Sequence, residues 1–358
     1  MLKLRRGVVS STDPLMVRIG EEDRPAWADA ALVGEMAAGD EVVVNTEAAD
    51  LGLGSGGFDI VHVNLTRGLN GPGPGEGGHV MKLNYTSLQH SVDPVEVDGE
   101  AGEMRERDGL PAPPVLVLPL HGHLPPSVWA ASRARPGIRI GYVQSAGGSL
   151  PGALSRDVVE LRGRGLLAGD MTAGSAYGGE HEGVTMLGAL DAAARRLRWD
   201  AIVCGPGPGI LGSATLYGHG GITALENAHA ALALGLPTLI SPRLSASDPR
   251  ERHRGLSHHT ETVLDLLLAS VRVAVPEIEL AGWPTGEEGG GVDMPSVLDA
   301  LHRVCDDAHD VQVEPVDLEG YRASGLPSET MGRSLDQDPL FFAAPLAAGR
   351  ALALASRA

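Results

Sequence analysis

Residues 201–221 read Ala-Ile-Val-Cys-Gly-Pro-Gly-Pro-Gly-Ile-Leu-Gly-Ser-Ala-Thr-Leu-Tyr-Gly-His-Gly-Gly, and the fold class follows from them and their surroundings. The first four residues form an apolar run of the length of a buried strand, bounded by glycine and proline. After the loop, apolar side chains recur at helical spacing at Ile222, Leu225, Ala228 and Leu232. The stretch therefore predicts a strand, a glycine-rich loop and a helix.

The same alternation extends over residues 115–358. Short aliphatic runs alternate with segments of helical spacing, and the predicted strands are Val115–Leu118, Ile138–Val143, Leu166–Asp170, Ala201–Cys204, Thr238–Ser241, Val271–Val275 and Val311–Val316. Parallel strands need crossover helices, so this order predicts a layered α/β domain with a mostly parallel sheet and flanking helices. The Ala- and Leu-rich stretch from Phe341 onward is expected to form a terminal packing helix.

Residues 1–96 follow a different pattern. Apolar and polar residues alternate at Leu15–Ile19, Val61–Leu65 and Met81–Tyr85, with a brief apolar run at Val42–Val44 and glycine-rich turns between them. These short strands predict a small β-barrel-like or sandwich-like domain. Residues 97–114 are acidic and then proline-rich, without periodicity, and are expected to form a linker to the α/β domain at 115–358.

Composition argues against several classes of protein. The formal net charge of −18 would repel a polyanion, so no nucleic-acid partner is expected. No stretch approaches the roughly 20 apolar residues that cross a bilayer, and Asp13 and Pro14 come too soon for a signal peptide. Two cysteines are too few for a disulfide framework. We therefore expect a cytoplasmic protein without a membrane partner, and the sequence leaves a homo-oligomer open.

Small, polar and titratable residues follow the predicted strands. Because ligands of parallel α/β sheets bind beyond the carboxyl ends of the strands, these loops are the expected site. Seven of the 13 histidines lie in five such loops, namely His121, His123, His181, His219, His253, His258 and His259. The sequence thus predicts one functional edge of the sheet.

The loop after Cys204 is the first candidate for an anion site. Its glycines would let backbone N–H groups approach a phosphate or carboxylate, and the following helix adds a positive dipole. The residues expected to bind such a ligand are Gly205, Gly207, Gly209, Ser213, Thr215, His219 and Gly220. A tight turn without a ligand is the alternative, since the loop has neither the P-loop ending nor the dinucleotide-binding spacing.

Arginines crowd the segment after the next predicted strand. Asp248-Pro-Arg-Glu251 has the form of a capped helix start, and Ser257 would cap the helix that follows. The arginines expected to neutralise an anionic ligand are Arg243, Arg250, Arg252 and Arg254. The alternative is a solvated face with internal salt bridges, for example to Glu251.

Three histidines of this segment, His253, His258 and His259, are the candidates for proton transfer. His258 and His259 would lie in the first turn of a helix, where the dipole favours the neutral imidazole.

A divalent metal ion is a candidate cofactor. His121, His123, Asp170 and Glu180 could form a mixed site of histidines and carboxylates, joined by His258 or His259. No H-E-x-x-H or comparable spacing is present, so such a site would have to be assembled by the fold, and isolated histidines are usually just hydrogen-bonded. Cys204, at a predicted strand end, is expected to be a core residue rather than a nucleophile.

Three segments together resemble a known family. They are Gly205-Pro-Gly with Ser213-Ala-Thr215 and Gly218-His-Gly-Gly221; Arg250–Thr260; and Thr330-Met-Gly-Arg333 with Asp338–Phe342. In these the chain resembles a bacterial domain-of-unknown-function family, the one numbered thirty-eight sixty-six, over nearly its whole length. The resemblance implies a bacterial protein and brings no activity, cofactor or catalytic residue with it.

Three functions are open at this point. The preferred one is an enzyme that acts on a small anionic molecule bearing phosphate or carboxylate. A metal-dependent hydrolase is the second. The third is a non-catalytic sensor, in which the α/β domain binds a metabolite and the β-rich domain relays that state to a partner.

Overall fold

The computed structural model describes residues 1–53, 56–69, 78–97, 112–279 and 292–356. The chain forms two compact units, Met1–Asp93 and Pro94–Ala358, each with its own hydrophobic core. Most of the predicted linker at 97–114 lies outside the described residues. Pro94–Glu96 are part of the second unit, where Val95 N donates to Glu182 O at 2.8 Å.

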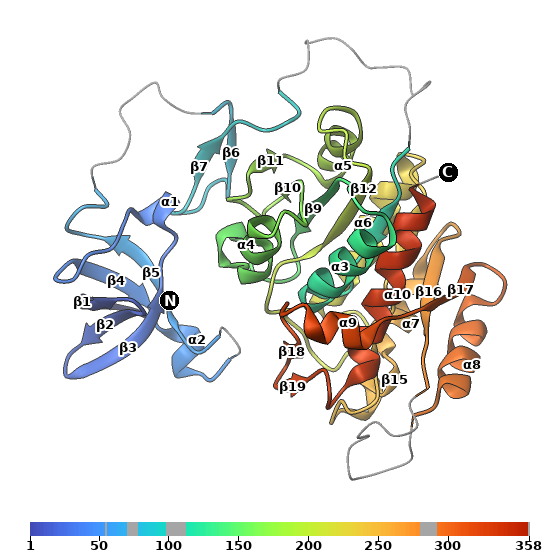
Figure 1. The fold of residues 1–358 in the computed structure, drawn as a ribbon. Coiled ribbons are helices and arrows are strands. Elements are labelled where there is room, and N and C mark those ends of the chain that lie inside the picture. Colours follow the sequence, from blue (N-terminus) through green and yellow to red (C-terminus); the bar gives the residue numbers. More distant parts are fainter. Residues whose placement is uncertain (54–55, 70–77, 98–111, 280–291, 357–358) are drawn as a thin grey trace. The chain divides into compact units, whose positions relative to one another are not determined.

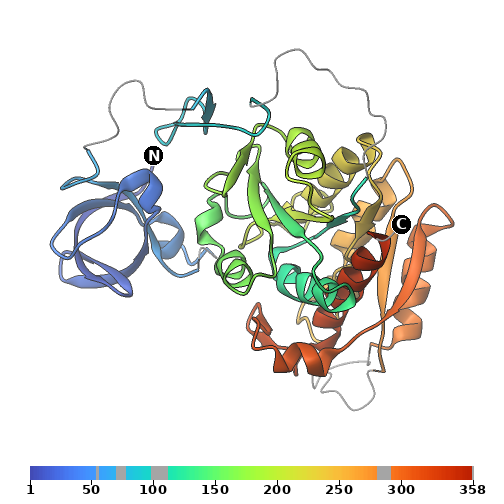
Figure 2. The same cartoon turned by 45° about the horizontal axis from the view of Figure 1, so that its top comes forward.

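The first unit contains a closed barrel with the strand order β1-β2-β3-β5-β4, which Figure 2 shows nearly end-on. Its strands are β1 (Leu4–Thr12), β2 (Leu15–Ile19), β3 (Glu22–Trp27), β4 (Glu41–Asn45) and β5 (Asp59–Asn64), with the single-turn helices α1 (Ala30–Val33) and α2 (Glu47–Asp50) between them. Inward-facing valines, among them Val17, Val42 and Val44, fill the barrel. Successive side chains of a strand point alternately into the barrel and toward solvent, which explains the alternation of apolar and polar residues in the sequence.

A hairpin of β6 (Val80–Lys82) and β7 (His90–Val92) follows in the same unit. The strand predicted over Met81–Tyr85 is wrong beyond Lys82. Leu83 and Tyr85 have φ angles of 48° and 61°, and residues in this left-handed region cannot continue a strand.

The second unit is built on an eight-stranded sheet with the order β11-β10-β9-β12-β8-β13-β16-β17, in which every neighbouring pair is parallel (Figure 1). The strands are β8 (Val115–Val117), β9 (Ile140–Ser145), β10 (Gly169–Ala173), β11 (His181–Gly183), β12 (Ala201–Pro206), β13 (Thr238–Ile240), β16 (Arg272–Glu277) and β17 (Asp310–Pro315). The central strands are buried along their whole length, which is why they appear as continuous apolar runs. The predicted α/β fold preceded by a small barrel is confirmed.

Helices cover both faces of this sheet. One face packs against α3 (Leu124–Ala134), α4 (Arg156–Gly163), α9 (Leu318–Ala323) and α10 (Pro339–Ala355), and the other against α5 (Met186–Arg195), α6 (Thr223–Ala233), α7 (His258–Leu266) and α8 (Met294–Cys305). Successive residues of a strand enter different cores, so Val115 and Val117 face α6 and its neighbours while Leu116 faces α3. Short β14 (Leu244–Ser245) and β15 (Gly255–Leu256), and likewise β18 (Glu329–Thr330) and β19 (Arg333–Ser334), pair outside the sheet.

The C-terminal helix α10 is almost wholly buried and lies directly against α3, as expected for a terminal packing helix. Ser127 Oγ donates to Pro345 O at 3.1 Å, and a Cβ on Gly349 would lie 2.0 Å from Ser127 O. The missing side chain at residue 349 therefore lets the two helix backbones approach. None of the helices in the described ranges combines the length and the apolar character needed to span a bilayer.

Candidate functional site

A pocket of about 480 Å³ lies beyond the carboxyl ends of strands β8, β12 and β13. Its lining comes from five stretches of chain, with Leu120–Gly122 after β8, Asp157, Pro208–Ser213 after β12, a group between Arg243 and His259 after β13, and Glu329–Met331. The helix after β8 packs on one face of the sheet, and the helix after β12 packs on the other. Adjacent strands whose connections leave in opposite directions open a crevice at this edge, where ligands of α/β sheets bind.

One buried carboxylate, Asp248, organises the arginines. It accepts hydrogen bonds from Arg243 at 3.1 Å, from Arg250 at 2.9 Å through both Nε and Nη2, and from Arg333 at 3.3 Å. Burial alone would raise the pKa of Asp248, but the hydrogen bonds and the positive charges of Arg250 and Arg243 lower it well below its usual range. We call these four residues the arginine cluster.

This arrangement corrects the helix start predicted at Asp248. The segment forms a single 3-10 turn, η4 (Glu251–His253), and the residue that precedes the turn is Arg250. The Asp248 carboxylate faces guanidinium groups instead of capping an α-helix. The internal salt bridges that were the alternative reading do form, but to Asp248.

Two arginines in the pocket retain unused donors. Arg243 is 4% exposed, and its buried Nε has no hydrogen-bond partner among the described residues. Burial lowers the pKa of Arg243 to about 10, so it is charged at neutral pH. Arg252 is exposed and pairs with no carboxylate in the described part of the chain. Arg254, in contrast, donates from Nε to Asp248 O at 2.9 Å and is not among the described lining residues.

The glycine-rich loop contributes less to the pocket than predicted. Three of its glycines, Gly205, Gly207 and Gly220, pack against other parts of the chain, and an added Cβ would come within 2.9 Å or less of an atom there. Gly209 and Ser213 do line the pocket. The Thr215 hydroxyl lies 2.7 Å from that of Ser213, within the loop. The start of α6, whose dipole was expected to favour an anion, is not part of the described lining. Close packing accounts for Gly205, Gly207 and Gly220.

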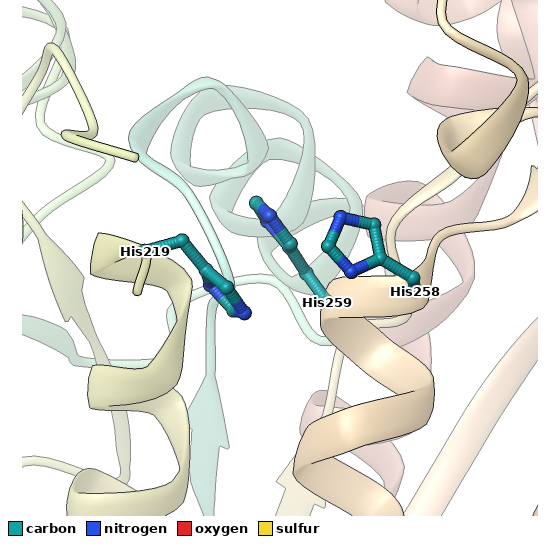
Figure 3. Close-up of side chains that lie close together, drawn as sticks. All are labelled: His219, His258 and His259. Atoms are coloured by element: carbon teal, nitrogen blue, oxygen red, sulfur yellow. The ribbon is translucent and has the colours of Figure 1, made fainter. Parts of the chain in front are cut away.

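Histidine rings from two segments of the chain lie close together as a cluster (Figure 3), and His259 is also one of the residues that line the pocket. His258 and His259 begin α7, and Ser257 caps this helix as predicted, accepting from His259 N at 3.3 Å. His219 precedes the 3-10 turn η3 (Gly220–Ile222). The His219 and His259 rings stack with centroids 3.6 Å apart, and the His258 ring lies 4.4 Å from that of His259 at an angle of 71°. His253 packs on His258 at 5.0 Å.

Burial keeps these imidazoles neutral. It lowers the pKa of His253 to about 3 and that of His259 to about 2, with further lowering by Arg243 and the neighbouring histidines. The pKa values of His219 and His258 are lowered for the same first reason. The neutral form was expected from the helix dipole, whereas burial is the main cause. The proton-transfer role of His253, His258 and His259 stays a prediction, and a lowered pKa makes an imidazole a weaker base.

Two ring nitrogens of the cluster, His219 Nδ1 and His258 Nε2, are buried without a hydrogen-bond partner in the described chain. His219, His258 and His259 each offer one nitrogen that lies within 4.8 Å of the other two. Within the described ranges, no other group of histidine, cysteine or carboxylate side chains has this metal-site spacing.

The metal ligands predicted from the sequence are not brought together. Asp170 and Glu180 both pair with Arg162, at 2.7 and 3.0 Å, away from the pocket described above. His123 is fully buried, with Nδ1 2.8 Å from Ser241 Oγ. Of the four, His121 lines the pocket. We therefore correct this assignment, because ion pairs and core hydrogen bonds occupy the predicted ligands separately.

Sequence reasoning missed Asp157, a carboxyl group in the pocket. It lies in the first turn of α4, with Oδ2 3.6 Å from His121 Nε2. Burial raises the pKa of Asp157 and lowers that of His121. The available signal was Ser155, which caps α4, but this short helix has too few apolar residues to show a clear period.

Fold and site together define an α/β protein with a candidate site at the carboxyl edge of a parallel sheet, in a chain that also carries a β-barrel unit. The chain belongs to the family described as protein of unknown function (DUF3866), whose model matches residues 25–349. The family resemblance seen in the three sequence segments is thereby confirmed. Neither the curated proteins nor the solved structures contain a match to this chain.

Proposed function

We propose that this chain is an enzyme that acts on a small anionic molecule bearing phosphate or carboxylate, bound in the pocket. The observation that carries the proposal is Arg243, a pocket-lining guanidinium that is 4% exposed and has an unpartnered buried Nε. Leaving a buried charged donor without an acceptor is unfavourable by about 1–3 kcal/mol or more. A small turn of the Arg243 side chain that brings Nε to the pocket wall would let a bound anion supply that acceptor, and arginine matches carboxylate and phosphate geometry.

The local charge balance also supports an anion. Three guanidiniums of the arginine cluster share the carboxylates of Asp248 and Asp338, which leaves one positive charge uncompensated. Arg252 adds a second. Glu329 also lines the pocket and offsets one of these two charges, whereas burial raises the pKa of Asp157 and disfavours its charged form, so one positive charge remains. The pocket can therefore attract an anion although the whole chain is acidic.

Asp157 is the group we assign to proton transfer. A carboxyl group whose pKa is raised by burial is suited to act as a general acid or base closer to neutral pH. Its neighbour His121 is held in one tautomer, because Nδ1 lies 3.2 Å from Pro206 O, which can only accept. His121 Nε2 then accepts from the Ser155 hydroxyl at 2.7 Å. These bonds fix the His121 ring beside the Asp157 carboxyl group, and we assign His121 the role of positioning Asp157.

The test is a melting-temperature screen with inorganic phosphate, phosphate monoesters and small carboxylates, followed by turnover assays on every stabilising compound. Arg252→Gln should weaken binding of the best compound about 10-fold, the usual effect of losing one charge-assisted contact. Arg133→Gln, an exposed arginine on α3, removes the same charge outside the described pocket lining and should leave binding unchanged.

Asp157→Asn should retain binding and lose turnover. Stabilisation by a compound that no assay shows to be converted would favour the sensor function. If no anion stabilises the protein, or if Arg252→Gln and Arg133→Gln behave alike, the anion pocket is wrong.

A further inference from the structure

We propose that His219, His258 and His259 bind one divalent transition-metal ion of the zinc class. The three side chains come from two separate segments, the loop after β12 and the first turn of α7, and converge in Figure 3. Each presents a nitrogen within 4.8 Å of the other two. Imidazole nitrogen is a preferred ligand of zinc and its neighbours in the transition series, and three histidines are a complete protein ligand set for a catalytic zinc.

Hydrogen bonding determines which nitrogen of His219 is available. His219 Nε2 lies 3.0 Å from Leu216 O, and a carbonyl oxygen can only accept, so Nε2 carries the proton. In the neutral ring Nδ1 then holds the free lone pair, and this buried atom has no partner among the described residues. Metal-binding histidines typically donate their other N–H to a carbonyl or carboxylate in this way.

Gly221 lies beside two of the ring nitrogens. A Cβ built on this residue would lie 3.1 Å from Nδ1 of His219 and 3.1 Å from Nδ1 of His259. Both nitrogens therefore border the same small volume, which exists because residue 221 has no side chain. The backbone of Gly221 is not among those with positive φ, so its conformation does not itself require glycine.

The distances between the three nitrogens are somewhat longer than those between ligand atoms on one zinc ion. Two nitrogens on a tetrahedral zinc with bonds of about 2.0–2.1 Å are roughly 3.3 Å apart, compared with a spread of up to 4.8 Å here. The His219 and His259 rings are stacked with centroids 3.6 Å apart and an interplanar angle of 7°, so binding of one ion by both requires the His259 ring to turn out of the stack while His219 keeps its bond to Leu216 O. We expect the backbone of η3 and α7 to stay in place.

Charge indicates what completes the site. Three neutral imidazoles leave both positive charges of the ion uncompensated, and His259 lines the same pocket as Arg243 and Arg250. A hydroxide, or an anion bound in the pocket, would supply the fourth ligand and the missing negative charge. This last step, that metal and anion stabilise one another, rests on the proposed function; the histidine site itself does not.

The test uses the full-length chain after removal of metal with a chelator. Zn²⁺ is titrated by calorimetry and Co²⁺ by visible absorption, whose intensity distinguishes four-coordinate from six-coordinate cobalt. We expect one ion per chain. Gly221→Ala places a methyl group between the nitrogens and removes no ligand, and it should weaken binding at least about 100-fold, as should His258→Ala. His302→Ala, an exposed histidine on α8, should bind as the wild type does.

Circular dichroism melting shows whether each variant is folded, and His258→Ala decides the matter if Gly221→Ala is not. The site is refuted if the wild type binds Zn²⁺ no more tightly than His258→Ala, or if a folded Gly221→Ala binds like the wild type. Titration with inorganic phosphate separates the two proposals. Phosphate binding without metal binding removes the metal site and keeps the anion pocket, and metal binding without phosphate binding does the reverse.

Discussion

Replacing Asp248 with asparagine should destabilise the α/β unit more than any exposed ion pair does. The carboxylate is fully buried and receives Arg243, Arg250 and Arg333, and it also accepts from Arg250 N at 3.0 Å. Asparagine keeps the shape of the side chain but cannot compensate the guanidinium charges. The variant thus removes the negative charge at the centre of the arginine cluster without opening a cavity.

The expected magnitude follows from the partners that are lost. Removing one member of a buried, hydrogen-bonded charge pair generally lowers the free energy of unfolding by about 3–5 kcal/mol. Arg333 keeps its bond to Asp338 at 3.1 Å and Arg250 is partly exposed, so about 3 kcal/mol is the better expectation. A unit of this size loses roughly 2 °C in melting temperature per kcal/mol, which gives a decrease of about 6 °C.

The effect should depend on pH. The folded-state pKa of Asp248 is lowered, so its contribution is complete above the unfolded-state pKa of about 3.9 and is lost as pH falls through the folded value. The stability difference between wild type and Asp248→Asn should therefore be constant between about pH 6 and 8 and shrink below about pH 4.

Chemical denaturation at several pH values measures both quantities. The matched control is Asp310→Asn, which breaks an exposed pair with Arg272 at 3.3 Å and should cost less than about 1 kcal/mol. If Asp248→Asn is no more destabilising than Asp310→Asn at pH 7, or if its effect grows as the solution is acidified, the assigned role of the buried carboxylate is incorrect.

Two further predictions concern packing and reactivity. Gly349→Ala should destabilise the protein by about 1–3 kcal/mol, because its Cβ would meet Ser127 O. Gly163→Ala on α4 places its Cβ in open space and should stabilise the protein by about 0.5–1 kcal/mol. Chemical denaturation checks both, because the two variants should shift the denaturation midpoint in opposite directions. Burial raises the pKa of Cys204 to about 12, so an alkylating reagent at pH 8 should leave its thiol unmodified until the chain unfolds, and rapid labelling of the folded protein would contradict the packing role.

The sheet could be predicted from sequence where its strands are buried on both faces. Val115–Val117 and Ala201–Pro206 are such strands, and their short apolar runs bounded by proline or glycine indicate a strand. The edge strand His181–Gly183 was missed because it is short, partly exposed and polar. The helix Leu124–Ala134 was missed because it begins with Pro125 and Pro126, which are favourable in a first helical turn but indicate a loop when they are read without context.

The site was predictable as a location and much less so as a set of roles. His121 and Arg243 both reach the pocket because parallel strands deliver their following loops to one edge, and that rule needs only the strand positions. Partners cannot be inferred this way. Asp248 matches a local capping pattern, but its carboxylate bonds to Arg333, 85 residues later in the chain, and Asp170 resembles a metal ligand until Arg162 is seen beside it.

Two glycines show why a residue's role depends on its tertiary neighbours. Gly220 and Gly221 are adjacent, and the sequence gives no reason to distinguish one from the other. In the fold, a side chain on Gly220 would collide with Gly147 O, so this residue serves the packing of two loops. A Cβ on Gly221 would instead lie 3.1 Å from Nδ1 of both His219 and His259. The proposed role of Gly221 in the metal site therefore depends on which atoms surround the position of its absent side chain. One of those atoms belongs to His259, which is distant in sequence, so no local sequence pattern contains it.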